Sequence, residues 1–280
     1  MIASNRNRKI DMSVGVPPSA DVVARFVGIK GEKFVPSRVR TLPLHLRLIA
    51  LLMVFVLPVL NARGAVLYWD VNTNPFNNVF NQAGTGMGGG GNLDLSAPLW
   101  WNGTTANRAW SNAANDTAVF GGTAGTATLG TGVNLTVGGL QFNQTGYTLN
   151  LGANTLTFGG ATNVVTLNTL SLPNATTAMS ATITGAFASA GSLMLSGGSA
   201  AGLSANTLNL NGTSTSGWSG ATTLGVGQTL ALAGLNQALV STSGITLNGG
   251  GLTLTNTSSA EGALNRVNNA AGITSNGGTI

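Results

Sequence analysis

The feature that most constrains this chain is a long stretch without any ionisable side chain. Between Asp116 and Glu261 lie 144 residues that include no Asp, Glu, Lys, Arg or His. A hydrolase or lyase needs carboxylates or basic groups, a Ser-His-Asp triad needs a histidine, and zinc needs His or Cys ligands. Because this stretch contains none of them, the composition argues against an enzyme, and we expect no metal and no cofactor.

Short runs of alternating apolar and polar residues recur through the same stretch. Apolar side chains occupy positions i and i+2, with Thr, Asn or Ser between them, as in Thr126–Leu129 and Thr229–Leu232. A period of two predicts strands with one buried face and one solvated face. Turns rich in Gly and Asn separate the runs, and no segment keeps a helical spacing of apolar residues. We therefore expect an all-β fold.

The shortness of the runs favours a solenoid over a sandwich or a barrel. Most runs span three to five residues, and only five aromatic side chains serve the last ~155 residues. At roughly 20–25 residues per coil, this length predicts six or seven coils. The expected fold is a right-handed parallel β-helix over 126–280. Its pattern continues to the last residue, so we expect a truncated reading frame or a fragment.

Residues 66–125 hold most of the aromatic side chains of the body, including four of the five tryptophans. This composition predicts a small aromatic-rich and Gly-rich β module at the N-terminal end of the β-helix. The aromatic side chains have two alternative uses. They form the module's own core or plug the end of the β-helix, or they offer an exposed platform on which sugar rings stack. The candidate glycan contacts are Trp100, Trp101 and Trp110.

The basic side chains gather at the start of the chain. Residues 1–65 hold ten cations against three acids and carry +7, whereas residues 66–280 hold two cations against four acids and carry −2. The net charge of +5 and the pI near 10.5 therefore describe the leader. The remaining body lacks the cationic face that nucleic-acid binding needs, so we expect no nucleic-acid partner.

The end of the leader has the pattern of a secretory signal. The apolar run Leu48–Leu60 suits a signal h-region and is shorter than a membrane-spanning helix. Ala62 and Gly64 stand at the −3 and −1 positions for cleavage before Ala65. We expect residues 1–65 to be a mostly disordered leader with a signal helix at the apolar run. This leader would engage the secretion machinery and touch the membrane only transiently. An uncleaved membrane anchor is the alternative.

One segment carries a recognisable motif. A Leu-rich run at 208–212 leads to an aromatic-Ser-Gly-x-Thr-Thr turn, and a Gly-x-x-Leu-x-Leu run follows at 227–232. This segment resembles the autotransporter-associated β-strand repeat. The motif residues are Trp218, Ser219, Gly220, Thr222, Thr223 and Leu224. The stretch from Trp110 to Leu149 is similar to the segment that commonly precedes such repeats in large exported bacterial proteins.

The resemblance implies a passenger-type β-helix, secreted or displayed at the bacterial cell surface or outer membrane and usually without catalytic residues. Relatives that export themselves carry a C-terminal barrel, for which the residues after Leu232 leave no room. The sequence thus predicts an exported, non-catalytic structural or adhesive protein, an adhesin whose partners are extracellular polysaccharide or cell surfaces. The alternative is a carbohydrate-binding module of a larger exported protein that uses the N-terminal tryptophans.

Overall fold

The computed structural model describes one part of the chain, which excludes residues 1–63 of the predicted leader and with them the predicted signal helix and Ala62. The described residues are 64–79, 86–167, 178–198, 205–211, 214–215, 217–233, 236–237, 239–255 and 266–280. They belong to the second of two compact units, Val59–Ile280. Every regular element in this part is a β-strand. A search of the same residues finds no helix with the length and apolar character to cross a membrane.

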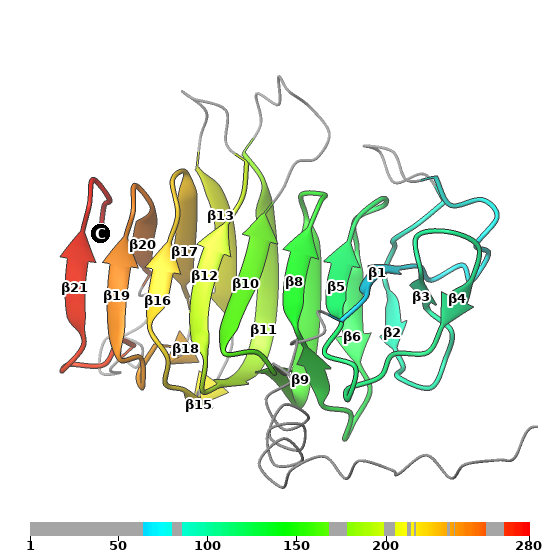
Figure 1. Cartoon of the computed structure of the whole chain (residues 1–280), viewed down its shortest axis with the longest axis horizontal. Helices are drawn as coiled ribbons and strands as arrows, with labels where there is room; N and C mark the ends of the chain where they lie inside the picture. The colour runs from blue at the N-terminus through cyan, green and yellow to red at the C-terminus, as the bar shows by residue number, and fades with distance from the viewer. Residues whose placement is uncertain are drawn as a thin grey trace, which may run out of the picture. The chain divides into compact units, whose positions relative to one another are not determined.

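The first sheet has ten strands, and eight of them are stacked side by side in chain order (Figure 1). Each of these eight pairs in parallel with the next. They are β1 (Val66–Trp69), β5 (Thr117–Phe120), β8 (Gly139–Phe142), β10 (Thr162–Leu167), β12 (Ser192–Ser196), β16 (Thr222–Leu224), β19 (Gly244–Leu247) and β21 (Gly272–Ser275). Antiparallel pairing adds β3 (Trp100–Trp101) and β4 (Asn107–Arg108) beyond β1.

The second sheet repeats this parallel order. Its main strands are β2 (Gly91–Leu93), β6 (Thr126–Leu129), β9 (Tyr147–Phe158), β11 (Ser180–Ser189), β13 (Asn206–Asn211), β17 (Gln228–Leu232) and β20 (Gly251–Leu254). The short strands β7 (Leu135–Val137) and β15 (Gly217–Trp218) pair with the second halves of β9 and β11. A separate two-stranded ladder joins β14 (Ser214–Thr215) to β18 (Asn236–Gln237).

The chain passes from the first sheet to the second and back again, which is the arrangement of a parallel β-helix. Leu135 pairs with Leu156 and Thr148 pairs with Thr182, so from β5 onward one coil takes about 21 to 34 residues. This range begins within the expected 20–25 residues and extends beyond it. The prediction of an all-β fold with parallel strands is confirmed, and the right-handed winding stays a prediction.

The two longest strands turn a corner in mid-strand and give the coil a third side. The register of β11 against β9 shifts between Thr184 and Ala186. Gly185 has a φ of 119° and Gly152, at the matching corner of β9, has a φ of 58°. Glycine adopts such angles without steric cost, so it allows the bend there. The alternating runs at 147–151 and 155–158 predict two separate strands, whereas the structure has one bent strand.

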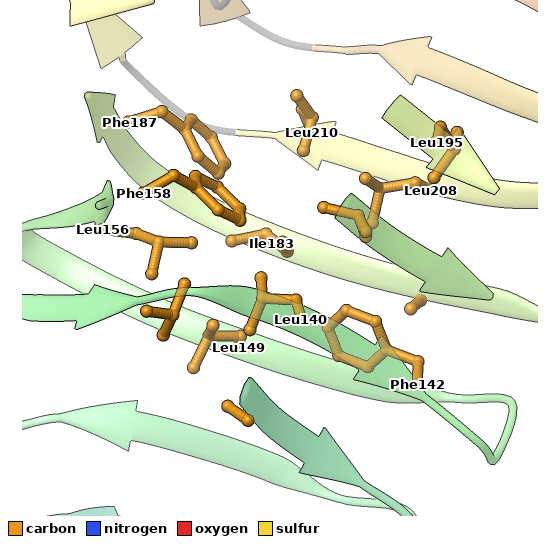
Figure 2. Close-up of a cluster of buried hydrophobic side chains, with 14 of the residues drawn as sticks. Leu140, Phe142, Leu149, Leu156, Phe158, Ile183, Phe187, Leu195, Leu208 and Leu210 are labelled. Carbon is orange, nitrogen blue, oxygen red and sulfur yellow. The ribbon is translucent and has the colours of Figure 1, made fainter. Parts of the chain in front are cut away.

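The core is a set of aliphatic rows, each running from coil to coil. One inward row of the first sheet is continuous through seven strands, and every member is almost fully buried. It consists of Leu67, Ala118, Leu140, Val165, Leu195, Leu224 and Leu247. Figure 2 shows Leu140, Leu195 and Leu208 among the side chains that fill the space between strands. A buried leucine of this kind stabilises the fold by about 1.5–3 kcal/mol.

The strands of residues 66–125 extend these same two sheets. β1 and β5 lie in the first sheet and β2 lies in the second, and their buried side chains belong to one continuous hydrophobic cluster with the later coils. The aromatic segment therefore contributes coil strands of its own, as well as the antiparallel pair β3 and β4. The division at residue 125 stays a prediction about folding units.

Candidate functional site: the outward polar face

The three tryptophans predicted to contact glycans lie inside the molecule. Trp100 is 0% exposed, Trp101 is 3% exposed and Trp110 is 5% exposed. The Trp100 ring lies 4.5 Å from that of Trp110 and 5.8 Å from that of Phe120, centroid to centroid. Stacking on a sugar needs an exposed ring face. This prediction therefore does not fit the structure, and the burial of the rings favours the alternative of a core or plug.

The aromatic cluster continues into the coils along the first sheet. Phe120 of β5 stacks on Phe142 of β8 at 5.3 Å, and Trp69 of β1 meets Trp100 edge to face at 5.4 Å. The Trp110 Nε1–H donates to the Thr136 carbonyl at 3.0 Å, as a buried indole usually finds an acceptor, whereas Trp100 Nε1 and Trp101 Nε1 are buried without one in the described part of the chain. These contacts tie the N-terminal end of the stack together.

The motif at Trp218 forms a corner between the third side and the first sheet. Trp218 is buried and its ring lies 5.5 Å from that of Phe158, two coils earlier. The Ser219 N–H donates to the Ser189 carbonyl at 3.0 Å, which links this corner to the preceding coil. A Cβ at Gly220 would lie 2.0 Å from the Gly191 carbonyl oxygen, so only glycine fits there.

The threonines of the same motif have different environments. Thr222 is fully buried, and its hydroxyl lies 3.3 Å from that of Thr242. The Thr242 hydroxyl also lies 2.8 Å from the Gly220 carbonyl, to which it donates. Thr223 points outward and is half-buried, whereas Leu224 is in the aliphatic row of the core. The contacts of the motif residues are with neighbouring coils, so their role is to hold the stack together.

The predicted cleavage region meets the chain again at Asp116. The Ala65 N–H donates to Asp116 Oδ1 at 2.6 Å, across a sequence separation of 51 residues. Arg108 Nη2 donates to Asp116 Oδ2 at 2.7 Å and forms an ion pair. A Cβ at Gly64 would lie 2.2 Å from the Asn115 carbonyl oxygen. Sequence reasoning gives no hint of this contact, because its partners are far apart in the chain.

Two other carboxylates of the described part, Asp70 and Asp94, accept hydrogen bonds from side chains and backbone. Asp70 is fully buried, and its Oδ2 accepts hydrogen bonds from Asn78 Nδ2 at 2.7 Å and Asn107 Nδ2 at 2.8 Å. Asp94 is half-buried, and hydrogen bonds from the Ser96 backbone and hydroxyl lower its pKa. Within the described ranges, no three His, Cys, Asp or Glu side chains gather where they could hold a metal ion.

A surface with a regular chemistry lies on the outward face of the second sheet. Two rows of hydroxyl and amide side chains run across its coils in register. We call them together the polar face. Its members are Asn92, Thr128, Asn150, Thr184 and Asn211 in one row and Thr126, Thr148, Thr182 and Asn209 in the other. The printed sequence of these strands contains no charged residue.

The polar face holds its side chains in fixed positions. Most members are half-buried, and only Asn92, Thr126 and Asn211 are exposed. The Thr184 hydroxyl donates to Asn150 Oδ1 at 3.0 Å, and Asn209 Nδ2 donates to the Ser180 hydroxyl at 2.9 Å. Parallel strands repeat about every 4.8 Å, and alternate residues of one strand are about 6.6 Å apart. The result is a regular array of uncharged donors and acceptors, and the polar-face side chains include no carboxylate, imidazole or amine.

Similarity to one known protein supports the interpretation of the chain as an exported protein. The chain is 44% identical over 103 residues to the adhesin BmaC autotransporter of Brucella suis biovar 1 (strain 1330). The alignment covers 35% of this chain and 3% of that adhesin, so the chain spans a small fraction of the length of the curated relative that it matches. No family model and no solved structure matches the chain. The similarity supports an autotransporter passenger-like protein, and the specific repeat family stays a prediction.

Proposed function

We propose that the chain is an exported, non-catalytic adhesive protein of the bacterial cell surface or outer membrane, which reaches that place through its signal peptide. The observation that carries this proposal is the polar face, a regular and uncharged array on a parallel β-helix. The similarity to an adhesin supports it. A scaffold of stacked coils suits adhesion, because it presents many identical weak contacts on a rigid surface.

The chemistry of the polar face favours neutral polysaccharide as the partner. A single hydrogen bond contributes about 0.5–1.5 kcal/mol, so binding must come from many bonds made together. Repeated coils supply them, and a polymer that follows the rows gains avidity from each added contact. An acidic polymer would find no cation to pair with along the polar face, whereas a neutral one loses nothing by that absence.

A binding assay with charged substitutions tests the proposal. Cells that express the full chain are incubated with immobilised cellulose, mannan and polygalacturonate, and the retained cells are counted. We expect retention on a neutral polymer, and a loss of at least about tenfold for Thr128→Lys/Thr184→Lys, because two cations interrupt the hydrogen-bonding rows. The matched control is Thr166→Lys/Thr246→Lys on the outward face of the first sheet, which should bind like the unaltered chain.

Three outcomes would contradict the proposal. Full-chain protein that stays in the cytoplasm would exclude a surface role. Equal losses for the two double variants, or none for either, would remove the polar face as the binding surface. Retention on polygalacturonate alone would show that charge, rather than the uncharged array, determines the partner.

A further inference from the structure

The contact between Ala65 and Asp116 has a chemical consequence if the leader is removed. Asp116 lies directly before β5 and its side chain is 3% exposed. The nitrogen that it accepts from belongs to the residue predicted to follow the cleavage site. In the continuous chain this nitrogen is a neutral amide. After cleavage between Gly64 and Ala65 it is a primary amine.

We propose that Asp116 is the docking site for the N-terminal ammonium group created by removal of the leader. This inference rests on the proposed export of the chain. A peptidase adds one water to the Gly64–Ala65 bond, so that Gly64 leaves with a carboxylate and Ala65 keeps an amine, which takes up a proton at neutral pH. The Asp116 carboxylate is already charged, as its ion pair with Arg108 shows, so the hydrogen bond to Asp116 Oδ1 gains a charged donor and becomes an ion pair as well.

The charges around this nitrogen favour the ammonium form. The charged side chains of the described part that face it are Asp116, at 2.6 Å, and Arg108, whose guanidinium lies on the opposite oxygen of the same carboxylate at 2.7 Å. The strand on the other side of β1 is β3, which contributes two tryptophans. The nearby carboxylate raises the pKa of the amine, and Arg108 opposes part of that rise. Asp116 is the closer group and is buried, so its effect dominates.

The sign of the pH dependence follows from this raised pKa. An unfolded chain has an α-amino pKa of about 7.7–8.0. The stabilisation by the ammonium is fully present below that range and is lost as the pH rises through the higher pKa of the folded state. Tyr68 and Tyr147 do not interfere, because burial raises both of their pKa values above the ordinary value of 10.0.

The composition makes this amine unusually easy to observe. Lys9, Lys30 and Lys33 are the lysines of the chain, and all precede the cleavage site, as does His45. A chain that begins at Ala65 therefore has its N-terminus as its only primary amine. Such a chain also has no side chain whose ordinary pKa lies between about 5 and 8. An amine-specific reagent would report on this group alone.

The first experiment identifies the N-terminus. The full chain is expressed in a bacterium, the exported fraction is separated from the cytoplasm, and the intact mass and N-terminal peptide are measured. An exported protein that begins at Ala65 supports the inference. Export with a different first residue overturns it while leaving the proposed function in place. An uncleaved cytoplasmic protein contradicts both.

The second experiment measures the rate at which the exported protein reacts with acetic anhydride at pH 7.5. Only the neutral amine reacts, so we expect folded protein to react about three- to tenfold more slowly than the same protein unfolded in guanidinium. Asp116→Asn should remove most of this protection. The control Asp94→Asn makes the same change at an aspartate whose hydrogen bonds go to Ser96 rather than to Ala65, and it should leave the rate unchanged.

A further variant keeps the inference testable if Asp116→Asn does not fold. Arg108→Gln removes the competing cation and keeps the carboxylate, so the folded variant should react at the rate of the unaltered protein or more slowly. Equal rates for folded and unfolded unaltered protein would overturn the inference. So would faster acetylation of folded Arg108→Gln, because the guanidinium would then be the group that protects the amine.

Discussion

At the scale of single residues, glycines at the corners allow successive coils to lie close together. A Cβ at Gly191 would lie 2.2 Å from the Gly160 carbonyl oxygen, and one at Gly220 would lie 2.0 Å from the Gly191 carbonyl oxygen. Both distances are far below van der Waals contact, and the opposing atoms are backbone, which cannot swing aside. The three glycines thus form a column that lets the corners stack. This explains physically why the motif at Trp218 contains a glycine.

A methyl group placed in this column should weaken the fold. We expect Gly220→Ala to lower the free energy of unfolding by about 1–3 kcal/mol, because it overpacks a backbone contact. Urea unfolding followed by circular dichroism measures the loss. The matched control is Gly272→Ala, since a Cβ at Gly272 meets nothing within 4 Å. If the urea midpoint of Gly220→Ala equalled that of Gly272→Ala, the corners of successive coils could separate without a loss of stability.

The buried tryptophans make a second prediction at this scale. Trp100→Ala should destabilise the fold by about 3–5 kcal/mol, because it opens a cavity between the rings of Trp69, Trp110 and Phe120. Phe76→Ala is the matched aromatic control, since Phe76 is 87% exposed. Thermal unfolding of the purified full chain would show the difference. If Trp100→Ala kept normal stability and lost polysaccharide binding, the result would instead support the hypothesis of an exposed platform on which sugar rings stack.

At the scale of elements, alternation along a strand separates packing from surface. The ten residues of β11 alternate between half-buried and buried without interruption. Ile183 faces the core, and its neighbours in register are Leu149 and Leu210. Thr182 faces outward as a member of the polar face. Two adjacent residues of one strand therefore have unrelated roles.

Truncation of these two neighbours should give very different results. Ile183→Ala should cost about 2–5 kcal/mol, because it leaves a cavity in a continuous row. Thr182→Ala should change stability by no more than about 0.5 kcal/mol, as expected for a surface position. Both are measured by urea unfolding under the same conditions. If Thr182→Ala proved as costly as Ile183→Ala, Thr182 would have to face the core as well, which would contradict the assignment of the two faces of β11.

The sequence predicts those strands whose inward residues are large. The expected strand at Thr126–Leu129 coincides with β6, and the one at Thr229–Leu232 lies within β17. The strand β11 is missed, although its alternation is complete, because two of its inward positions are Ala181 and Gly185. Small residues give a weak periodic signal, and their burial depends on the coils above and below. The sequence of the strand alone therefore does not show that these small residues are buried.

The candidate site is predicted only in part for the same reason. The residue types of the polar face can be read from the alternation, since Thr and Asn occupy the solvated positions. The burial of the three tryptophans cannot be read from the sequence in this way. Composition identifies Trp100, Trp101 and Trp110 as aromatic but does not fix which side of a sheet each one occupies. The contact of Ala65 with Asp116 joins residues 51 positions apart. Only the register of β1 against β5 brings them together.

At the scale of the whole described region, stability comes mainly from burial and backbone pairing, although the buried Arg266 guanidinium also donates to the Leu232 and Thr255 carbonyls. Aliphatic rows and parallel ladders connect every coil to the next. The structure shows one ion pair in the part of the chain that it describes, between Arg108 and Asp116. The guanidinium is 46% exposed, so solvent screens it and the pair adds little. The rest of the stack offers few charges on which salt could act.

Added salt should therefore barely change the melting temperature of the exported protein. Raising NaCl from about 0.01 M to 1 M shortens the screening length from about 30 Å to 3 Å, which weakens exposed charge pairs. The loss of one such pair costs at most about 1 kcal/mol, which for a chain of this size lowers the melting temperature by no more than about 4 °C. Scanning calorimetry at the two salt concentrations measures the shift. Asp116→Asn, which lacks the pair, should show a smaller salt dependence still. A drop of 10 °C or more would mean that charges outside the described ranges hold the coils together.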